Sequence, residues 1–230
     1  ALRRVLSRLV PEAGEALVNQ MVQDSKEGGG ASLTDMIDQR CFLGDFFQPL
    51  LTAQEQGQVA VFDVESTGTN VYEDDIIQMA AIRLDSQGQE SGRFLRFLKP
   101  SKPVGDSQRV HGFSDAFLAE HGVSPAQALE EFLELVKGRV IVGHNVGFDM
   151  AITRSNLKRL GIGQPLDNLW YDTLDLSRRF LKKAPNHKLE TLARLLQTPH
   201  QPSHDAMDDI LATADLLGLL TKTYLLPGTS

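Results

Sequence analysis

Apolar and polar residues follow two different periods along the chain. In residues 1–57 the apolar positions recur at helical spacing, as at Leu6 and Leu9, until Gly28–Gly30 interrupts the pattern. From residue 58 onward, short apolar runs replace it. We therefore predict a small helical N-terminal module or linker-bearing extension over residues 1–57, and a second domain over residues 58–230.

The second domain begins with three predicted strands. The runs Val59–Phe62, Ile76–Leu84 and Arg93–Leu98 are joined by short connections, which is typical of an antiparallel meander. Later strands and helices alternate: we expect strands at 140–142 and 169–171, and helices at 125–137, 150–160, 173–183, 187–197 and 206–225. This order predicts an α/β fold, in which a mixed sheet of the meander plus parallel strands is flanked by helices.

One helix start has a clear local signature. Ser124 precedes Pro125 and Ala126, and Gln127 follows three positions after the serine. We expect Ser124 to be the N-cap, Pro125 to occupy the first helical position, and Gln127 to form the reciprocal capping bond.

Composition narrows the class of protein. The chain has 230 residues, 41% of them hydrophobic, and 30 acidic against 23 basic residues give a net charge of −7. Disorder as the main state is excluded by this apolar content. The single cysteine, Cys41, excludes an intramolecular disulfide and a cysteine zinc cluster, so we expect a cytoplasmic protein. No run approaches the roughly 20 apolar residues of a membrane helix, and the negative charge argues against a nucleic-acid coat protein.

Two acids stand at the end of the first predicted strand. Asp63 and Glu65 are two residues apart, so their side chains project from the same face of an extended chain. Two carboxylates that close repel each other unless a proton or a cation lies between them, and Mg²⁺ prefers oxygen ligands. The alternative is a pair of solvated acids at a strand end.

A third acid follows another strand. Asp149 comes after the predicted strand 140–142, through a short segment that contains Gly143 and Gly147. Ligands in open α/β sheets bind beside the carboxyl ends of strands, so Asp149 lies near Asp63 if the two strands are neighbours. Otherwise it is an ordinary acid in the first turn of a helix.

The last cluster lies at the start of the final predicted helix. Asp208 shares its helix face with Asp205 and Asp215, whereas Asp209 shares its face with Ala206 and Leu216. A carboxylate on an apolar face is costly unless it is paired or binds a metal, so Asp209 is the functional candidate.

His204 precedes this helix. Considered alone, His204 would be interpreted as a surface histidine. Beside converging carboxylates, it becomes a good general base near neutral pH.

Taken together, these segments resemble the DEDDh exonucleases, the family that includes the proofreading subunit of bacterial replicative polymerase. The resemblance covers residues 58–225. Phe62–Gly68 is similar to the first motif, with Ser66 where the family usually has threonine, and Gly143–Asp149 is similar to the second. The third, His204-x-Ala206-x-x-Asp209, selects Asp209 over its acidic neighbour. Supporting similarities occur at Val110–Phe113, Asp172–Leu176 and Lys188–Leu192.

The resemblance implies a ribonuclease-H-like fold and removal of mononucleotides from a 3′ end. It implies two Mg²⁺ or Mn²⁺ ions, one held by Asp63, Glu65 and Asp209 and the second by Asp63 and Asp149. His204 would deprotonate the attacking water. By family position, the terminal nucleotide would contact Ser66, Thr67, Gly68, His111, Asn145 and Phe148.

The most basic stretch covers residues 178–194, with six Lys or Arg residues against Glu190. It is either a solvated helix face or a surface that follows the substrate backbone.

Divalent cations bound at the acidic site would reverse the sign of the electrostatic field there. A net charge of −7 therefore no longer disfavours a nuclease.

Three functions remain open on the sequence. We favour a 3′-to-5′ exonuclease that acts on single-stranded DNA. An exoribonuclease of the same family is the alternative, because the motifs do not show how a 2′-hydroxyl is accommodated. A third is an inactive nucleic-acid-binding or scaffold domain, and the complete catalytic set argues against it.

The context of the chain is equally open. Residues 1–57 could dock a polymerase or a helicase, and a start at Ala1 rather than Met indicates a piece of a longer protein. The chain stops at Ser230 without the longer tail that joins proofreading subunits to their polymerase, so we do not expect a replicase role. Proofreading, repair, end trimming and defence against mobile elements all fit.

Overall fold

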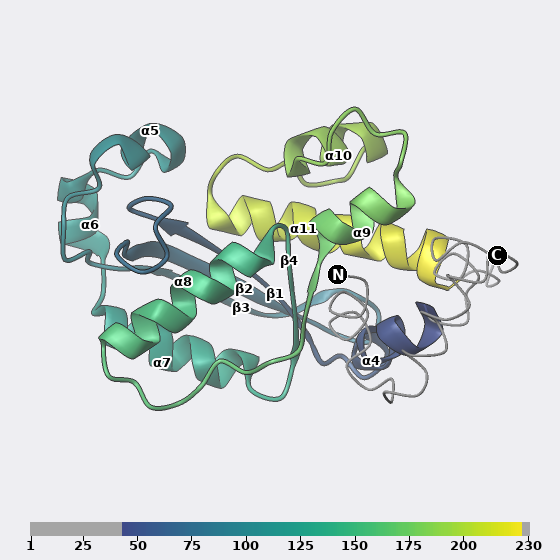
Figure 1. Cartoon of the computed structure of the whole chain (residues 1–230), viewed down its shortest axis with the longest axis horizontal. Coiled ribbons are helices and arrows are strands. Elements are labelled where there is room, and N and C mark those ends of the chain that lie inside the picture. The colour runs from purple at the N-terminus through teal and green to yellow at the C-terminus, as the bar shows by residue number, and fades with distance from the viewer. Residues whose placement is uncertain (1–42, 227–230) are drawn as a thin grey trace, which may run out of the picture. The chain divides into compact units, whose positions relative to one another are not determined.

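The computed structural model describes residues 43–226. The chain divides between Leu51 and Thr52 into two units, and the sheet belongs to the second. Its strands lie in the order β3-β2-β1-β4-β5 (Figure 1). β1–β2 and β2–β3 are antiparallel, and β1–β4 and β4–β5 are parallel. The strands are β1 (Val59–Ser66), β2 (Ile76–Leu84), β3 (Glu90–Phe97), β4 (Val140–Gly143) and β5 (Trp170–Asp172).

Helices cover both faces of this sheet. α7 and α8 pack on one face, α11 packs on β1 and β2 from the other, and α9 and α10 contact α11 (Figure 1). The helices are α4 (Leu43–Glu55), α5 (Gln108–His111), α6 (Asp115–His121), α7 (Pro125–Val136), α8 (Val146–Arg159), α9 (Thr173–Phe180), α10 (Leu189–Leu196) and α11 (Ala206–Leu220). A mixed sheet of a meander plus two parallel strands, flanked by helices, confirms the predicted fold class. Within the described residues, none of the helices has the length and apolar character needed to cross a membrane.

The main apolar core lies between the sheet and α7 and α8. Phe62 and Val64 on β1 contribute to it with Phe132 on α7. The rings of Phe62 and Phe132 are 4.6 Å apart between centroids, and Phe94 is 6.2 Å from Phe132. All these side chains are buried, so alternate residues of β1 are committed to this side of the sheet.

Three local features differ from the sequence prediction. α5 and α6 were not predicted, because helices of four and seven residues are too short for their apolar period to be read. α8 begins at Val146 rather than at residue 150, directly after Asn145 in the left-handed conformation. Pro125 does open α7, but the Ser124 side chain makes no capping bond, and Gln127 donates to Glu131 instead.

The predicted domain boundary follows residue 57, and the chain divides into its two units after Leu51. The predicted module ended at residue 57, and residues 1–42 lie outside the described part, so its helices before Leu43 are not seen. α4 (Leu43–Glu55) lies within the predicted helical module.

Candidate active site

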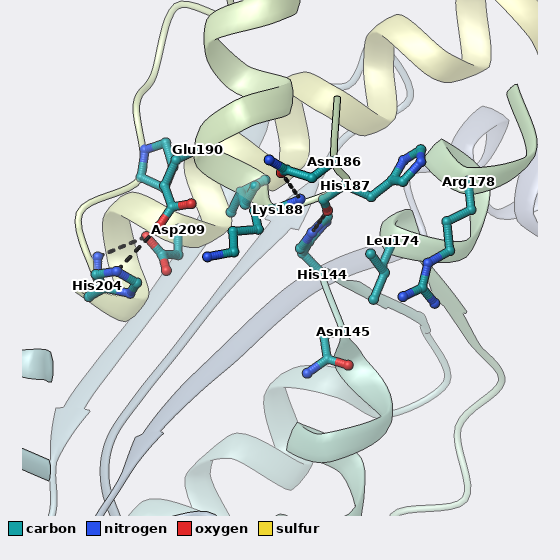
Figure 2. A pocket seen from close by; sticks show the side chains of 12 residues that line it. His144, Asn145, Leu174, Arg178, Asn186, His187, Lys188, Glu190, His204 and Asp209 are labelled. Carbon is teal, nitrogen blue, oxygen red and sulfur yellow. Dashed lines mark hydrogen bonds and ion pairs between the residues drawn. The ribbon is translucent and has the colours of Figure 1, made fainter. Parts of the chain in front are cut away.

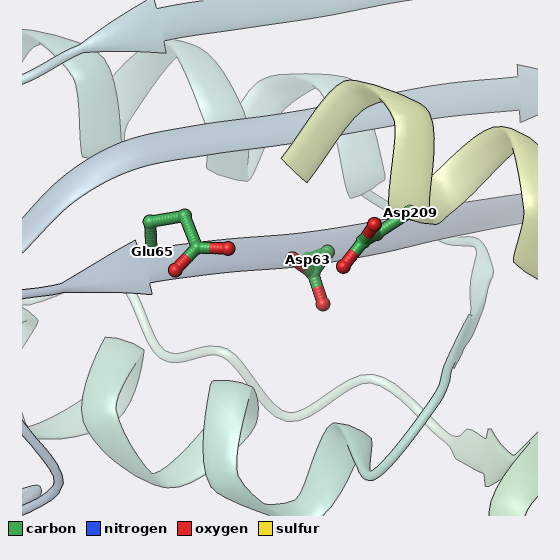
Figure 3. A group of neighbouring side chains, drawn as sticks. All are labelled: Asp63, Glu65 and Asp209. Carbon is green, nitrogen blue, oxygen red and sulfur yellow. The ribbon is translucent and has the colours of Figure 1, made fainter. Parts of the chain in front are cut away.

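β1 brings two acids to the side of the sheet opposite its apolar core. Asp63 and Glu65 alternate with Phe62 and Val64, so both carboxylates project toward α11 (Figure 3). Ala80, a small residue, is the register partner of Asp63 on β2. Both acids are half-buried.

α11 supplies a third carboxylate from above the strand. Oxygens of Asp63, Glu65 and Asp209 lie within 4.8 Å of one another (Figure 3). The neighbouring Asp208 is exposed and accepts a hydrogen bond from the Ser203 hydroxyl. The helical period therefore separates two adjacent acids: one faces the sheet and the other faces water.

Asp149 reaches the same region from the first turn of α8. Its side chain is 4% exposed, and its Oδ1 accepts a hydrogen bond from the Val64 backbone N–H at 3.3 Å. This bond ties the start of α8 to β1 between Asp63 and Glu65. The structure thus brings the four predicted acids together from the end of one strand and the starts of two helices.

These carboxyls hold protons more tightly than free acids do. Burial, then the charges of Asp149 and Asp209, raises the pKa of Asp63 well above its usual range. Burial and then Asp209 raise the pKa of Glu65 to about 8. Burial also raises the pKa of Asp149 to about 8, despite the bond from Val64, and burial raises that of Asp209. A cation among these four groups would favour their ionised forms.

His204 lies beside this cluster. The residue is exposed and has a φ of 63°, and its backbone N–H donates to Asp209 Oδ1 at 3.3 Å. Its Nε2 is 3.3 Å from Glu190 Oε1 on α10 (Figure 2). Glu190 is a residue that the sequence did not single out as functional, because it is an isolated acid in a basic stretch.

A pocket of about 550 Å³ extends from His204 and Asp209 toward α9 (Figure 2). Two of its lining residues, Arg178 and Lys188, are exposed cations from the predicted basic stretch. The pocket is therefore lined by both acidic and basic side chains, with Lys188 next to Asp209 and Arg178 farther away (Figure 2). Its wall also contains His144, Asn145, Leu174, Asn186, His187, Leu189, Glu190 and Pro202.

The wall of the pocket is fixed by side-chain hydrogen bonds. His144 is held through both ring nitrogens, with Nδ1 2.9 Å from Thr173 Oγ1 and Nε2 donating to the His187 carbonyl. The N–H of Asn145 donates to Asp172, which also caps α9. Among the predicted substrate-contacting residues, Asn145 lines this pocket.

The other predicted substrate contacts lie elsewhere. Ser66 donates to the Gly68 carbonyl, and Thr67 uses its hydroxyl and its N–H on Asp74 and Asp75. A Cβ on Gly68 would approach Asp74 Oδ2 to 2.5 Å, so a larger residue here would displace the Asp74 side chain.

Two further residues of the predicted substrate set have contacts within the fold. His111 is buried, and both of its ring nitrogens have partners: Nδ1 accepts from the Phe113 N–H, and Nε2 lies 2.9 Å from the Ser107 hydroxyl. Phe148 is half-buried against the apolar core, so neither side chain is freely exposed.

Comparison with known proteins places this geometry among nucleases. The sequence profile of an exonuclease family, RNase T, matches residues 60–217. A PolC-type DNA polymerase III of Caldanaerobacter subterraneus is 31% identical over 173 residues, and that of Bacillus subtilis is 30% identical over 169 residues. Each match covers 73% of this chain and 12% of the relative, so the chain spans about an eighth of the length of these polymerases.

Solved structures show the same fold. E. coli exonuclease I, in a zinc-bound complex with single-stranded DNA, is 26% identical with a TM-score of 0.66, covering 74% of this chain and 41% of that one. Exonuclease X in complex with 5′-overhanging duplex DNA is 19% identical with a TM-score of 0.57, covering 73% of this chain and 93% of that one.

Proposed function

The chain belongs to the exonuclease family of DEDDh, DnaQ-like enzymes, whose members are 3′-to-5′ exonucleases, and we propose that it releases nucleoside 5′-monophosphates from single-stranded DNA. The observation that carries this proposal is the convergence of Asp63, Glu65 and Asp209, with carboxylate oxygens within 4.8 Å of one another. Such a half-buried cluster, close to Asp149, is suited to hydrolysis of a phosphodiester bond.

The chemistry of the donor set fits hard divalent cations. The converging side chains offer oxygen atoms alone, and their raised pKa values mark a site that a positive charge would stabilise. We propose that Asp63, Glu65 and Asp209 hold one Mg²⁺ or Mn²⁺, and that Asp63 and Asp149 hold a second. Cations bound there supply water activation and neutralise charge on the scissile phosphate.

We assign the proton transfer to His204. The side chain is exposed beside Asp209, and Glu190 lies 3.3 Å from Nε2, where it can orient the imidazole. His204 would accept the proton of the attacking water, and Glu190 would stabilise the imidazolium that forms.

We propose that the strand upstream of the scissile bond runs into the 550 Å³ pocket. Arg178 and Lys188 line this pocket, where they would neutralise phosphate groups. Asn145 would contact the nucleotide beside the acids. Exonuclease I and exonuclease X, both solved with bound DNA, support DNA over RNA as substrate.

The test is digestion of 5′-labelled substrates by the full chain. Single-stranded DNA, duplex DNA with a 5′ overhang, and RNA of the same sequence are compared with Mg²⁺, with Mn²⁺ and with a chelator. We expect a ladder that shortens from the 3′ end of single-stranded DNA and that requires the cation. Faster digestion of RNA would reassign the enzyme as an exoribonuclease, and activity in chelator would refute the metal site.

Two adjacent acids provide a matched control. Asp209→Asn removes a carboxylate from the cluster, whereas Asp208→Asn removes one from the exposed face of the same turn. We expect Asp209→Asn to lower kcat by about 10³-fold and Asp208→Asn to change it by less than about 3-fold. Equal effects would remove the basis for assigning Asp209 to the site.

The similarity to PolC-type polymerases favours a replication context, contrary to our expectation from the position of Ser230. We propose proofreading, with residues 1–57 as a separate module that docks a polymerase or helicase and residues 58–230 as the exonuclease domain. A proofreading enzyme should remove a mispaired 3′ nucleotide from a primer faster than a paired one. Equal rates on both primers would favour repair or end trimming.

A further inference from the structure

β2 contains a buried polar side chain that the proposed mechanism does not use. Gln78 is fully buried between Ile77 and Met79, on a strand whose other buried residues are apolar. A buried amide is costly unless its donor and acceptor are both satisfied. Its register partner on β1 is Glu65, so it lies on the face of the sheet that carries the acids.

Both ends of the Gln78 amide bind the first residues of α11. Nε2 donates to Asp205 Oδ2 at 2.8 Å, and Oε1 accepts from the Ala206 N–H at 3.0 Å. The other oxygen of Asp205 caps the helix by accepting from the Met207 N–H at 2.9 Å. Two hydrogen bonds from one side chain therefore fix the N-terminus of α11 to β2.

The fixed end of α11 is one turn from Asp209. The Asp209 N–H donates to the Asp205 carbonyl at 3.0 Å, so a displacement of Asp205 would carry Asp209 with it. The remaining partners, Asp63 and Glu65, lie on β1, which is paired to the strand of Gln78. The two halves of the acidic cluster are thus joined through this amide.

We propose that Gln78 is a positioning residue that sets the distance of Asp209 from Asp63 and Glu65 and hence the affinity and geometry of the cation site. The inference rests on the proposed function insofar as Asp209 is a metal ligand. An amide is required because the site offers an acceptor, Asp205 Oδ2, and a donor, the Ala206 N–H, side by side.

The hydrogen bond between Gln78 and Asp205 should be restored when donor and acceptor are exchanged between the two positions. In the double variant Gln78→Glu/Asp205→Asn, the new glutamate accepts from the new asparagine amide and from the Ala206 N–H, while the asparagine oxygen still accepts from Met207. The total charge is unchanged. The single variant Gln78→Met keeps a side chain of similar length but leaves the Ala206 N–H and Asp205 Oδ2 without a partner. In the single variant Asp205→Asn, the new amide group would face the Gln78 amide group, and both are hydrogen-bond donors.

The test compares these variants in the full chain by Mn²⁺ titration calorimetry and by steady-state digestion of single-stranded DNA. We expect Gln78→Met to weaken Mn²⁺ binding about 10-fold and to lower kcat up to about 100-fold, with little change in KM. The exchanged double variant should recover both values to within about 3-fold of wild type. Ile82→Val, a buried change on the same face of β2, is the control and should leave both unchanged.

Wild-type Mn²⁺ affinity and kcat in Gln78→Met would overturn the proposal, as would a folded double variant that binds Mn²⁺ more than about 10-fold more weakly than wild type. If Gln78→Met does not fold, the double variant still decides, because it retains every hydrogen bond. Absence of hydrolysis by the wild type would refute the proposed function, while calorimetry would still test the role of Gln78.

Discussion

The two faces of β1 use one backbone for opposite purposes. Phe62 and Val64 enter the apolar core against α7 and α8, where burial is favourable. Asp63 and Glu65 alternate with these apolar residues and project toward α11. Burial there raises the pKa values of both carboxyls, so it disfavours their charged forms. The apolar face holds the strand in place, and that rigidity lets the acidic face keep like charges close together.

This difference separates stability from chemistry within a few residues. A change on the apolar face should lower the free energy of unfolding and leave the chemistry of the folded enzyme intact. Removal of a carboxylate from the acidic face should impair the chemistry and raise the free energy of unfolding, since repulsion between like charges is relieved.

The largest expected effect is that of Asp63→Asn. Asp63 belongs to both proposed cation sites, so kcat should fall by about 10⁴-fold. In chelator at pH 8 the same variant should melt at a higher temperature than wild type, because a buried carboxylate is gone. Digestion assays and calorimetric melting measure the two quantities. A melting temperature in chelator below that of wild type would contradict the idea that the acidic face destabilises the metal-free protein.

Phe132→Ala tests the opposite face. The ring is fully buried against Phe62 and Phe94, and its removal leaves a cavity. We expect the free energy of unfolding to fall by about 3–5 kcal/mol, measured by urea denaturation. Below the melting transition, kcat per folded molecule should stay within about 3-fold of wild type. A large loss of kcat in the folded state would show that the two faces are coupled.

The pH dependence of stability should differ with and without cations. Folding raises the pKa of Glu65 to about 8, as it does for Asp149, so the native state binds protons more tightly than the unfolded state. The resulting stability is complete below the unfolded pKa near 4 and is lost as pH rises toward 8. In chelator, the free energy of unfolding should fall by at least about 2 kcal/mol between pH 5 and pH 8.

Two controls sharpen that experiment. Saturating Mg²⁺ should flatten the fall, because a bound cation favours the ionised carboxyls. Glu65→Gln in chelator should also have a shallower fall than wild type. A profile in chelator that rises from pH 5 to pH 8 would contradict the raised pKa values of the cluster.

The smallest effect is expected at Lys188, one of the cations that line the pocket. Lys188→Gln should raise KM for single-stranded DNA about 3–10-fold with little change in kcat, and should reduce the slope of log KM against log salt by about 0.7. Lys137→Gln, at the amino end of β4 in a different pocket, is the matched control and should change neither. Equal effects of both would indicate general attraction rather than a strand path through the pocket.

Local patterns were sufficient for much of this architecture. β2 extends over Ile76–Leu84, as its apolar run predicts, because a fully buried strand must be apolar along its length. The separation of Asp208 from Asp209 followed from the helical period alone. The short helices α5 and α6 and the early start of α8 at Val146 carried no comparable signal.

The longer helices and strands, the mixed sheet and the identity of the candidate acids could be predicted from the sequence alone, because backbone geometry imposes periods that side chains must follow. Which groups meet became clear from the three-dimensional arrangement. The bonds of Asp149 to Val64 and of Gln78 to Asp205 join residues 85 and 127 positions apart, and Glu190 reaches His204 from a separate helix. Such contacts depend on strand register and on how α11 packs over the sheet, and no local period encodes either.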